Sequence, residues 1–145
     1  MTLTLDTARA IIRNVFAEGA ARGCKPLSVV VLDGGGHVIA FERSDGGSPM
    51  RFAIAHGKAH GAVMMGIGSR ALFQRAEAQP YFIQAMNTLT DGALVPVPGG
   101  VLVRSNDAII GAVGVTGDTS DADEACAVAA ITAAGFTPDP GGAPA

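Results

Sequence analysis

The sequence predicts an α+β protein in which helices cover both faces of an antiparallel sheet of four or five strands. Two pairs of short β-branched segments, each joined by a turn, predict two hairpins. Both pairs are apolar over most of their length, whereas a sheet with one face in water alternates more clearly between apolar and polar residues. Segments with helical spacing of apolar residues surround the hairpins. The expected order of elements is α-β-β-α-α-β-β-α.

In the first half of the chain, residues 4–21 are expected to form an amphipathic helix that Thr4 caps. Two strands follow at 27–32 and 37–43, and the turn "DGGGH" joins them into the first hairpin. A polar, Gly-rich loop then leads to a helix over 51–65, which ends where "GIGS" interrupts the apolar pattern.

In the second half, Ser69 is expected to cap a short turn, and residues 77–88 are expected to form a helix. The segment "GVLVRSNDAIIGAVGVTG" predicts the second hairpin, with its turn at 105–107. A last helix is expected over 120–134. The closing "TPDPGGAPA" has the composition of a flexible tail, which we place at 138–145.

The bulk composition is that of a small globular protein. Its 145 residues, 48% hydrophobic and 16% charged, fit one domain, which we assign to residues 1–137. A net charge of −3, no Trp and scattered Lys and Arg argue against nucleic-acid binding. No apolar run suits a membrane helix and no signal peptide is recognisable, so we expect a cytoplasmic protein. Cys24 and Cys126 are expected to be reduced packing residues.

The stretch "HGKAH" holds two histidines, His56 and His60, at a spacing that puts both on one helix face. The two imidazoles could bind one metal ion or carry out acid–base chemistry, and either one alone could bind haem iron. The alternative is a pair of histidines on a hydrated helix face that binds no ligand. Gly57 occupies the place of the glutamate in the zinc-protease motif, so that motif is excluded. Lys58 could bind a carboxylate, or transfer a proton if its ammonium group is desolvated. The alternative is a side chain that is simply hydrated at the surface.

Arg43 and Asp45 lie where the second strand leaves the sheet, in "FERSDGG". Loops at strand ends often build binding sites. The two side chains suit either an ion pair that fixes the loop or, through Arg43, recognition of a carboxylate.

Acidic residues gather at the start of the last helix, in "GDTSDADEACA". Acids at a helix start are favourable with the helix dipole and need no ligand, and a hard cation is the alternative. Asp118 and Glu124 are the candidate metal ligands, either here or as a third ligand beside the histidines. Ser120 and Asp123 have capping-box spacing.

Three blocks, "VVVLDGGGHVIAFERSDGG", "AIAHGKAHGAVMMGIGSRAL" and "VPGGVLVRSNDAIIGAVGVTGDTSDADEACAVAAI", together resemble the GlcG/HbpS-like family. That family includes haem-binding HbpS proteins and the C-terminal domain of PduO-type proteins. The resemblance implies a profilin-like α-β-α sandwich and a homo-oligomer. The lysine of the family's shared block falls on Lys58, whereas His56 and His60 fill variable positions and Gly61 replaces the usual threonine. Lys58, Arg43 and Asp45 are the pocket residues that the resemblance implies.

The expected function is binding of a small ligand, with haem or a related tetrapyrrole as the leading ligand. In that interpretation His60 or His56 is the axial ligand, and Lys58 or Arg43 holds a propionate. The alternative is an enzyme of a catabolic pathway that acts on a small organic acid, in which Arg43 binds the carboxylate and Lys58 or a histidine such as His60 moves a proton. A purely structural subunit of a larger assembly is the third interpretation.

Overall fold

The computed structural model describes residues 2–143, and its centre is one five-stranded sheet in which every neighbouring pair is antiparallel. The strand order is β2-β1-β4-β3-β5. The outer strand β5 extends the two predicted hairpins, so the expected antiparallel sheet of four to five strands is confirmed. The strands are β1 (Ser28–Asp33), β2 (Val38–Arg43), β3 (Gly100–Ser105), β4 (Ala108–Thr116) and β5 (Thr137–Asp139).

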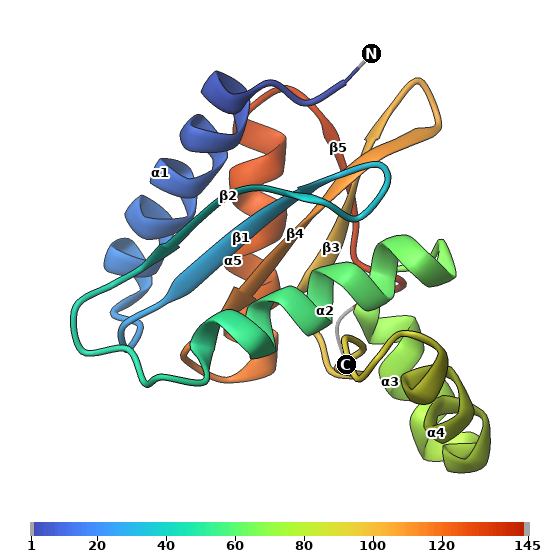
Figure 1. Ribbon diagram of the computed structural model, residues 1–145. Helices are drawn as coiled ribbons and strands as arrows, with labels where there is room; N and C mark the ends of the chain where they lie inside the picture. Colours follow the sequence, from blue (N-terminus) through green and yellow to red (C-terminus); the bar gives the residue numbers. More distant parts are fainter. Residues whose placement is uncertain (1, 144–145) are drawn as a thin grey trace.

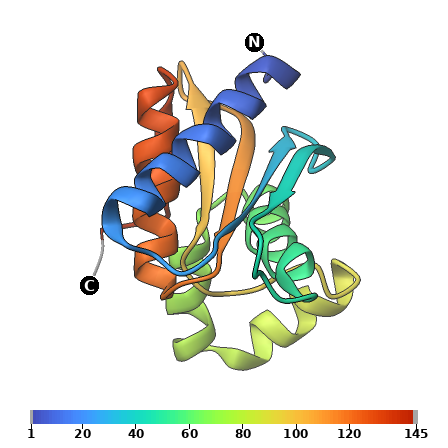
Figure 2. The same cartoon turned by 90° about the vertical axis from the view of Figure 1, so that its left-hand side faces the viewer.

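Helices lie on both faces of this sheet, as the apolar strands predict. Figures 1 and 2 show α1 and α5 side by side on one face and α2 on the other, while α3 and α4 extend beyond the end of α2. The helices are α1 (Leu5–Arg22), α2 (Arg51–Met65), α3 (Ser69–Ala78), α4 (Pro80–Leu89) and α5 (Ser120–Ala133). The α-β-α sandwich is therefore confirmed.

Alternation along the central strands divides the core into two layers. On β1, Val29 and Val31 pack into the cluster beneath α1 and α5, whereas Val30 and Leu32 pack toward α2. Because successive strand residues point to opposite faces, a strand buried on both faces is apolar throughout. This explains why the hairpins show little polar alternation.

Two glycines allow α2 to lie directly on the sheet. Gly100 of β3 and Gly114 of β4 are cross-strand partners. A Cβ atom at Gly100 would overlap the Lys58 carbonyl, and one at Gly114 would overlap the Ala55 carbonyl. Only a hydrogen atom fits between these strands and the helix backbone, so this glycine pair sets the height of α2 above the sheet.

The segment between α2 and the second hairpin contains more helix than the sequence predicts. Ser69 begins α3, a helix of 10 residues, where a short turn was expected. Pro80 then opens α4, so the predicted helix over 77–88 begins three residues later. Proline suits the first turn of a helix because the amide that it lacks would have no helical partner.

The last helix and the segment after it also differ in detail. Thr119, not Ser120, caps α5, and its side chain accepts a hydrogen bond from the Ala122 amide at 3.2 Å. Residues 137–139, at the start of the segment expected as a tail, form β5, and Arg104 forms a 2.8 Å salt bridge with Asp139. The end of that predicted tail, residues 144–145, lies outside the described residues.

Candidate functional site

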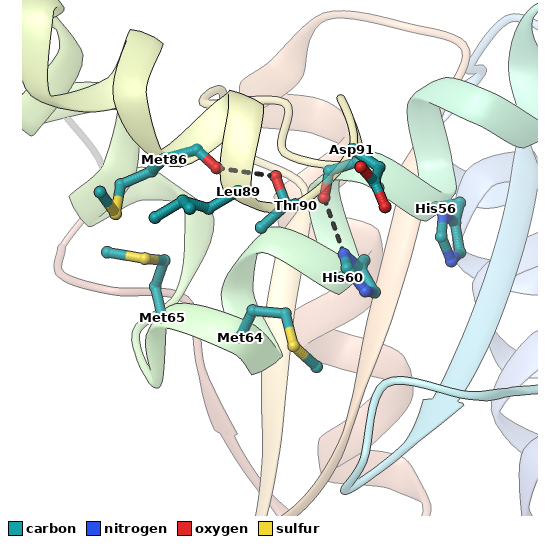
Figure 3. Close-up of a pocket in the computed structure, with 9 residues that line it drawn as sticks. His56, His60, Met64, Met65, Met86, Leu89, Thr90 and Asp91 are labelled. Carbon is teal, nitrogen blue, oxygen red and sulfur yellow. Dashed lines mark hydrogen bonds between the residues drawn. The ribbon is translucent and has the colours of Figure 1, made fainter.

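One face of α2, the second half of α4 and the start of the segment after α4 line an open cavity of about 650 Å³ (Figure 3). Such a volume is within the usual range of small-molecule pockets. The side chains around it are mostly apolar, with two imidazoles on one edge. They are His56, His60, Met64, Met65, Met86, Leu89, Thr90, Asp91 and Ala93.

One nitrogen of the His60 ring is held by a hydrogen bond to the backbone. Its Nδ1 lies 2.8 Å from the Ala93 carbonyl oxygen. A carbonyl oxygen only accepts, so Nδ1 carries the hydrogen, and the neutral ring presents a lone pair at Nε2. Metal-binding histidines commonly have this arrangement, in which one ring nitrogen is fixed by a carbonyl and the other is left for the metal.

The turn between β1 and β2 lies next to that free nitrogen. A Cβ atom at Gly36 would lie 2.7 Å from the Met64 methyl carbon and 3.7 Å from His60 Nε2. The methyl end of Met64 and the Nε2 edge of His60 therefore lie close together beneath the turn.

His56 lies one helical turn before His60 and stacks on it. The two ring centroids are 5.0 Å apart, and on its other side His56 stacks on Phe52 at 5.4 Å. Burial, helped by the neighbouring His60, lowers the pKa of His56 below its usual value. The neutral imidazole is thus favoured near pH 7, and neutral imidazole is the form that binds metals.

Three methionines and a leucine provide most of the apolar lining. In Figure 3, Met65 from α2 and Met86 from α4 point toward each other, and Met64 lies beside His60. Leu89 at the end of α4 is 76% exposed. Flexible thioether side chains adapt to a flat apolar ligand better than branched ones do.

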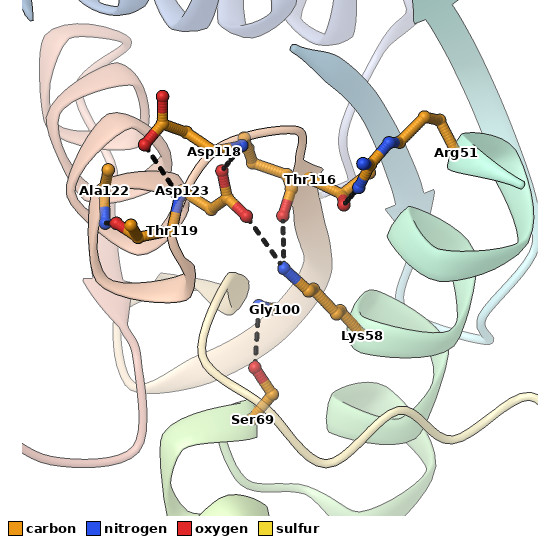
Figure 4. A network of polar contacts seen from close by, with 10 residues as sticks. Arg51, Lys58, Ser69, Gly100, Thr116, Asp118, Thr119, Ala122 and Asp123 are labelled. Carbon is orange, nitrogen blue, oxygen red and sulfur yellow. Dashed lines mark hydrogen bonds and ion pairs between the residues drawn. The ribbon is translucent and has the colours of Figure 1, made fainter. Parts of the chain in front are cut away.

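Lys58 lies outside this cavity, on the side of α2 that faces the sheet. Its ammonium donates to the Val115 carbonyl and to Asp123 Oδ2, each at 3.0 Å (Figure 4). The side chains of Lys58 and Asp123 are both 2% exposed. Burial lowers the pKa of Lys58 and raises that of Asp123, while their mutual attraction opposes both shifts. Lys58 therefore joins α2 to α5.

Arg43 and Asp45 are exposed at the end of β2 and in the following loop. Neither residue lines the cavity beside the histidines. Within residues 2–143 they form no ion pair with each other, so the loop-fixing pair is absent there. The structure thus brings His56 and His60 together, but places Lys58, Arg43 and Asp45 elsewhere.

The acidic cluster at α5 is used for internal contacts. Both Glu124 oxygens accept hydrogen bonds from the buried Arg70 guanidinium, the shortest at 2.9 Å, and Asp121 also contacts Arg70. Asp118 accepts from the Lys25 and Thr119 amides, at 2.8 and 2.7 Å.

These contacts give both carboxylates protein partners, and they lend no support to the prediction of Asp118 and Glu124 as metal ligands. Throughout the described part of the chain, no three His, Cys, Asp or Glu side chains gather in a way that suits a metal ion. His56 and His60 remain as a pair without a third ligand of those types.

Sequence reasoning missed several residues of this region. No local sequence pattern marks Arg70 as a buried ion-pair residue, because its partners lie more than 50 residues later in the chain. A local pattern does mark Met64, since it continues the four-residue spacing of His56 and His60. Ala93 reaches His60 through its backbone, which no side-chain pattern reveals.

The fold is that of an α-β-α sandwich domain in which helix α2 borders a ligand-sized cavity. The model of a family described as "Haem degrading protein HbpS-like" matches residues 3–132. This chain belongs to that family. None of the described helices is both long and apolar enough to cross a membrane.

Solved structures with the same fold agree with this assignment. PduOC in complex with heme has a TM-score of 0.84 at 21% identity, covering 94% of this chain and 97% of that one. The ORFY protein of Klebsiella pneumoniae has a TM-score of 0.83 at 26% identity, covering 92% and 91%. A double mutant of Streptomyces reticuli HbpS has a TM-score of 0.77 at 27% identity, covering 92% and 87%. The search of curated proteins gave no match.

Proposed function

We propose that this protein binds haem or a related tetrapyrrole in the cavity between α2 and α4, with His60 as the axial ligand. The observation that carries the proposal is the His60 ring, which lines an apolar cavity and whose Nδ1 donates to the Ala93 carbonyl, so that Nε2 is the nitrogen left to bind iron. Family membership and the heme complex of PduOC support the choice of ligand.

The cavity lining fits such a ligand. Met64, Met65, Met86 and Leu89 offer apolar surface for the faces of a macrocycle, and His60 offers the imidazole nitrogen that haem iron accepts. When bound, haem supplies a redox-active iron, and the protein's contribution is the axial nitrogen, the apolar surroundings and the exclusion of water.

The positions of Lys58 and Arg43 change the expectation that one of them holds a haem propionate. Lys58 is held by Asp123 and Arg43 lies elsewhere, so neither is assigned to a propionate. No Lys or Arg of the described residues lines the cavity, and Asp91 is its one charged group there. In this proposal the binding energy comes from apolar contact and from the iron–imidazole bond.

Titration with hemin, followed through the Soret band, tests the proposal. The wild type should show a saturable shift at micromolar protein. His60→Asn should weaken binding at least tenfold, because the Asn amide can still donate to Ala93 while Nε2 is removed. His37→Asn is the matched control, since His37 is exposed on the β1–β2 turn. A wild type without a saturable shift, or a His60→Asn variant that binds like wild type, would disprove the assignment.

We also propose that the protein forms a homo-oligomer, as its family resemblance implies. The support is the exposed apolar surface on α4, where Leu89 is 76% and Tyr81 67% exposed. Exposed apolar side chains gathered in one region are typical of association surfaces. Light scattering at micromolar protein should give a multiple of the 14.5 kDa chain mass, and a monomer mass would refute the proposal.

A further inference from the structure

We propose that His60 and Met64, with His56 as a third donor, form a binding site for a soft monovalent cation, and that Cu(I) is the ion it suits. This goes beyond tetrapyrrole binding, because it assigns a ligand role to a thioether that the haem proposal uses only for packing.

The three donors lie at successive turns along one face of α2. Residues four apart on a helix project in the same direction, and His56, His60 and Met64 follow that spacing. His56 and His60 lie ring against ring, with centroids 5.0 Å apart. All three line the same cavity (Figure 3).

The free edge of His60 and the end of Met64 meet beneath the β1–β2 turn. A single point, the position of a Cβ atom at Gly36, lies 2.7 Å from Met64 Cε and 3.7 Å from His60 Nε2. The Nδ1–H of His60 is held by Ala93, so the ring directs its lone pair to this side. The methyl end of Met64 and the Nε2 edge of His60 therefore lie close together beneath the turn, on one face of α2.

The donor set selects the class of cation. Thioether sulfur is a soft ligand that favours Cu(I), imidazole accepts copper as well, and hard ions such as Mg²⁺ and Ca²⁺ require carboxylate or carbonyl oxygens. Zinc sites in proteins use thiolate, imidazole and carboxylate rather than thioether. Two imidazoles and a thioether in an apolar cavity therefore suit a singly charged soft ion better than Zn²⁺.

Silver(I), which mimics Cu(I) and is stable in air, provides the test. The protein labelled with ¹³C at its methionine methyl groups is titrated with Ag(I) in chloride-free buffer, in excess over its two cysteines. The Met64 methyl signal should shift. The Met50 signal should remain, because Met50 is 61% exposed and lies outside the cavity.

Variants then assign the donors. His60→Asn and Met64→Leu should each lower the affinity for Ag(I) at least tenfold, and Met50→Leu should leave it unchanged. Met64 is 45% exposed, so Met64→Leu leaves the buried core intact. Equal shifts of Met50 and Met64, or a Met64 shift that persists in His60→Asn, would overturn the proposal.

Hemin titration of the same variants separates this inference from the haem proposal. Met64 lines the proposed haem cavity, so the discriminating result is a Met64→Leu variant that loses much more affinity for Ag(I) than for hemin, because leucine supplies apolar contact but no sulfur. A wild type that binds hemin but shows no Met64 response to Ag(I) refutes the cation site alone. A wild type that responds to Ag(I) but not to hemin refutes the haem proposal alone.

Discussion

Lys58 of α2 and Asp123 of α5 form a 3.0 Å salt bridge in which both side chains are only 2% exposed. The bridge is extended on either side: Asp123 Oδ1 accepts from the Asp118 amide, and the Lys58 ammonium also donates to Val115. It connects the helix that borders the cavity to the helix on the opposite face of the sheet. A buried charge with so many partners fixes a helix in place more readily than it takes part in chemistry.

Lys58→Met should therefore destabilise the protein by about 3–5 kcal/mol, because it leaves the Asp123 carboxylate buried without its partner. The double variant Lys58→Met, Asp123→Leu should recover much of that loss, since no charge then remains in the interior. Urea unfolding measures both values. A single variant as stable as the double variant would show that the salt bridge does not hold α2.

Gly114→Ala should lift α2 from the sheet, because the new Cβ atom overlaps the Ala55 carbonyl. Overpacking of this kind destabilises by about 1–3 kcal/mol, and here the obstacle is rigid backbone. Gly34→Ala is the matched control: its Cβ would meet nothing closer than 3.5 Å. Thermal unfolding should separate the two variants by several degrees, and equal melting temperatures would contradict the tight seating of α2.

The pH dependence of stability should reveal His56. Its pKa in the folded protein is lowered from 6.5, so folding favours the neutral ring, and this contribution is present above pH 6.5 and lost as the pH falls through the lowered folded pKa. His56→Phe keeps a ring to stack on Phe52 but cannot take up a proton. The variant should lose less stability than wild type between pH 7 and pH 5, as measured by urea unfolding. Parallel losses would indicate that His56 does not titrate in this way.

The layers of the fold were predictable because they follow from local signals. Helical spacing located α1, α2 and α5 to within a residue or two, and the turn at Asn106 and Asp107 has the positive φ values that its sequence favours. The division of α3 from α4 and the docking of β5 were not predictable. They depend on packing against distant elements, such as the pairing of β5 with β3.

The candidate site was predictable only in part, for a similar reason. The spacing of His56 and His60 places them on one helix face, but it does not say which face is buried. Lys58 appeared to be a pocket residue until the structure placed Asp123, 65 residues later in the chain, against it. Met86 and Ala93 complete the cavity from a segment whose position no local pattern specifies.

The two cysteines should differ in reactivity. Cys126 is buried in the core, and burial next to Cys24 raises the pKa of its thiol to about 12. Thiolate is the nucleophile, so Cys126 should resist alkylation at pH 8. Cys24 is only partly buried and lines a small recess beside Pro26. Mass spectrometry after native alkylation should find one adduct, on Cys24, and two after denaturation; an adduct on native Cys126 would contradict its burial.

Asp91 should weaken the binding of an anionic tetrapyrrole, because it is the charged residue that lines the cavity. Haem carries two carboxylates, and like charges at an exposed site repel each other over several ångströms, with a strength that salt reduces. Asp91→Asn removes the charge and keeps the shape, and asparagine tolerates the positive φ of 53° at this position. The variant should bind hemin two- to tenfold more tightly at low salt, and the difference should shrink as salt is added. Asp107→Asn is the control, since Asp107 has a similar left-handed backbone, with φ of 66°, on the distant β3–β4 turn. An Asp91→Asn variant with unchanged affinity at low salt would place the carboxylates of the ligand away from this end of the cavity.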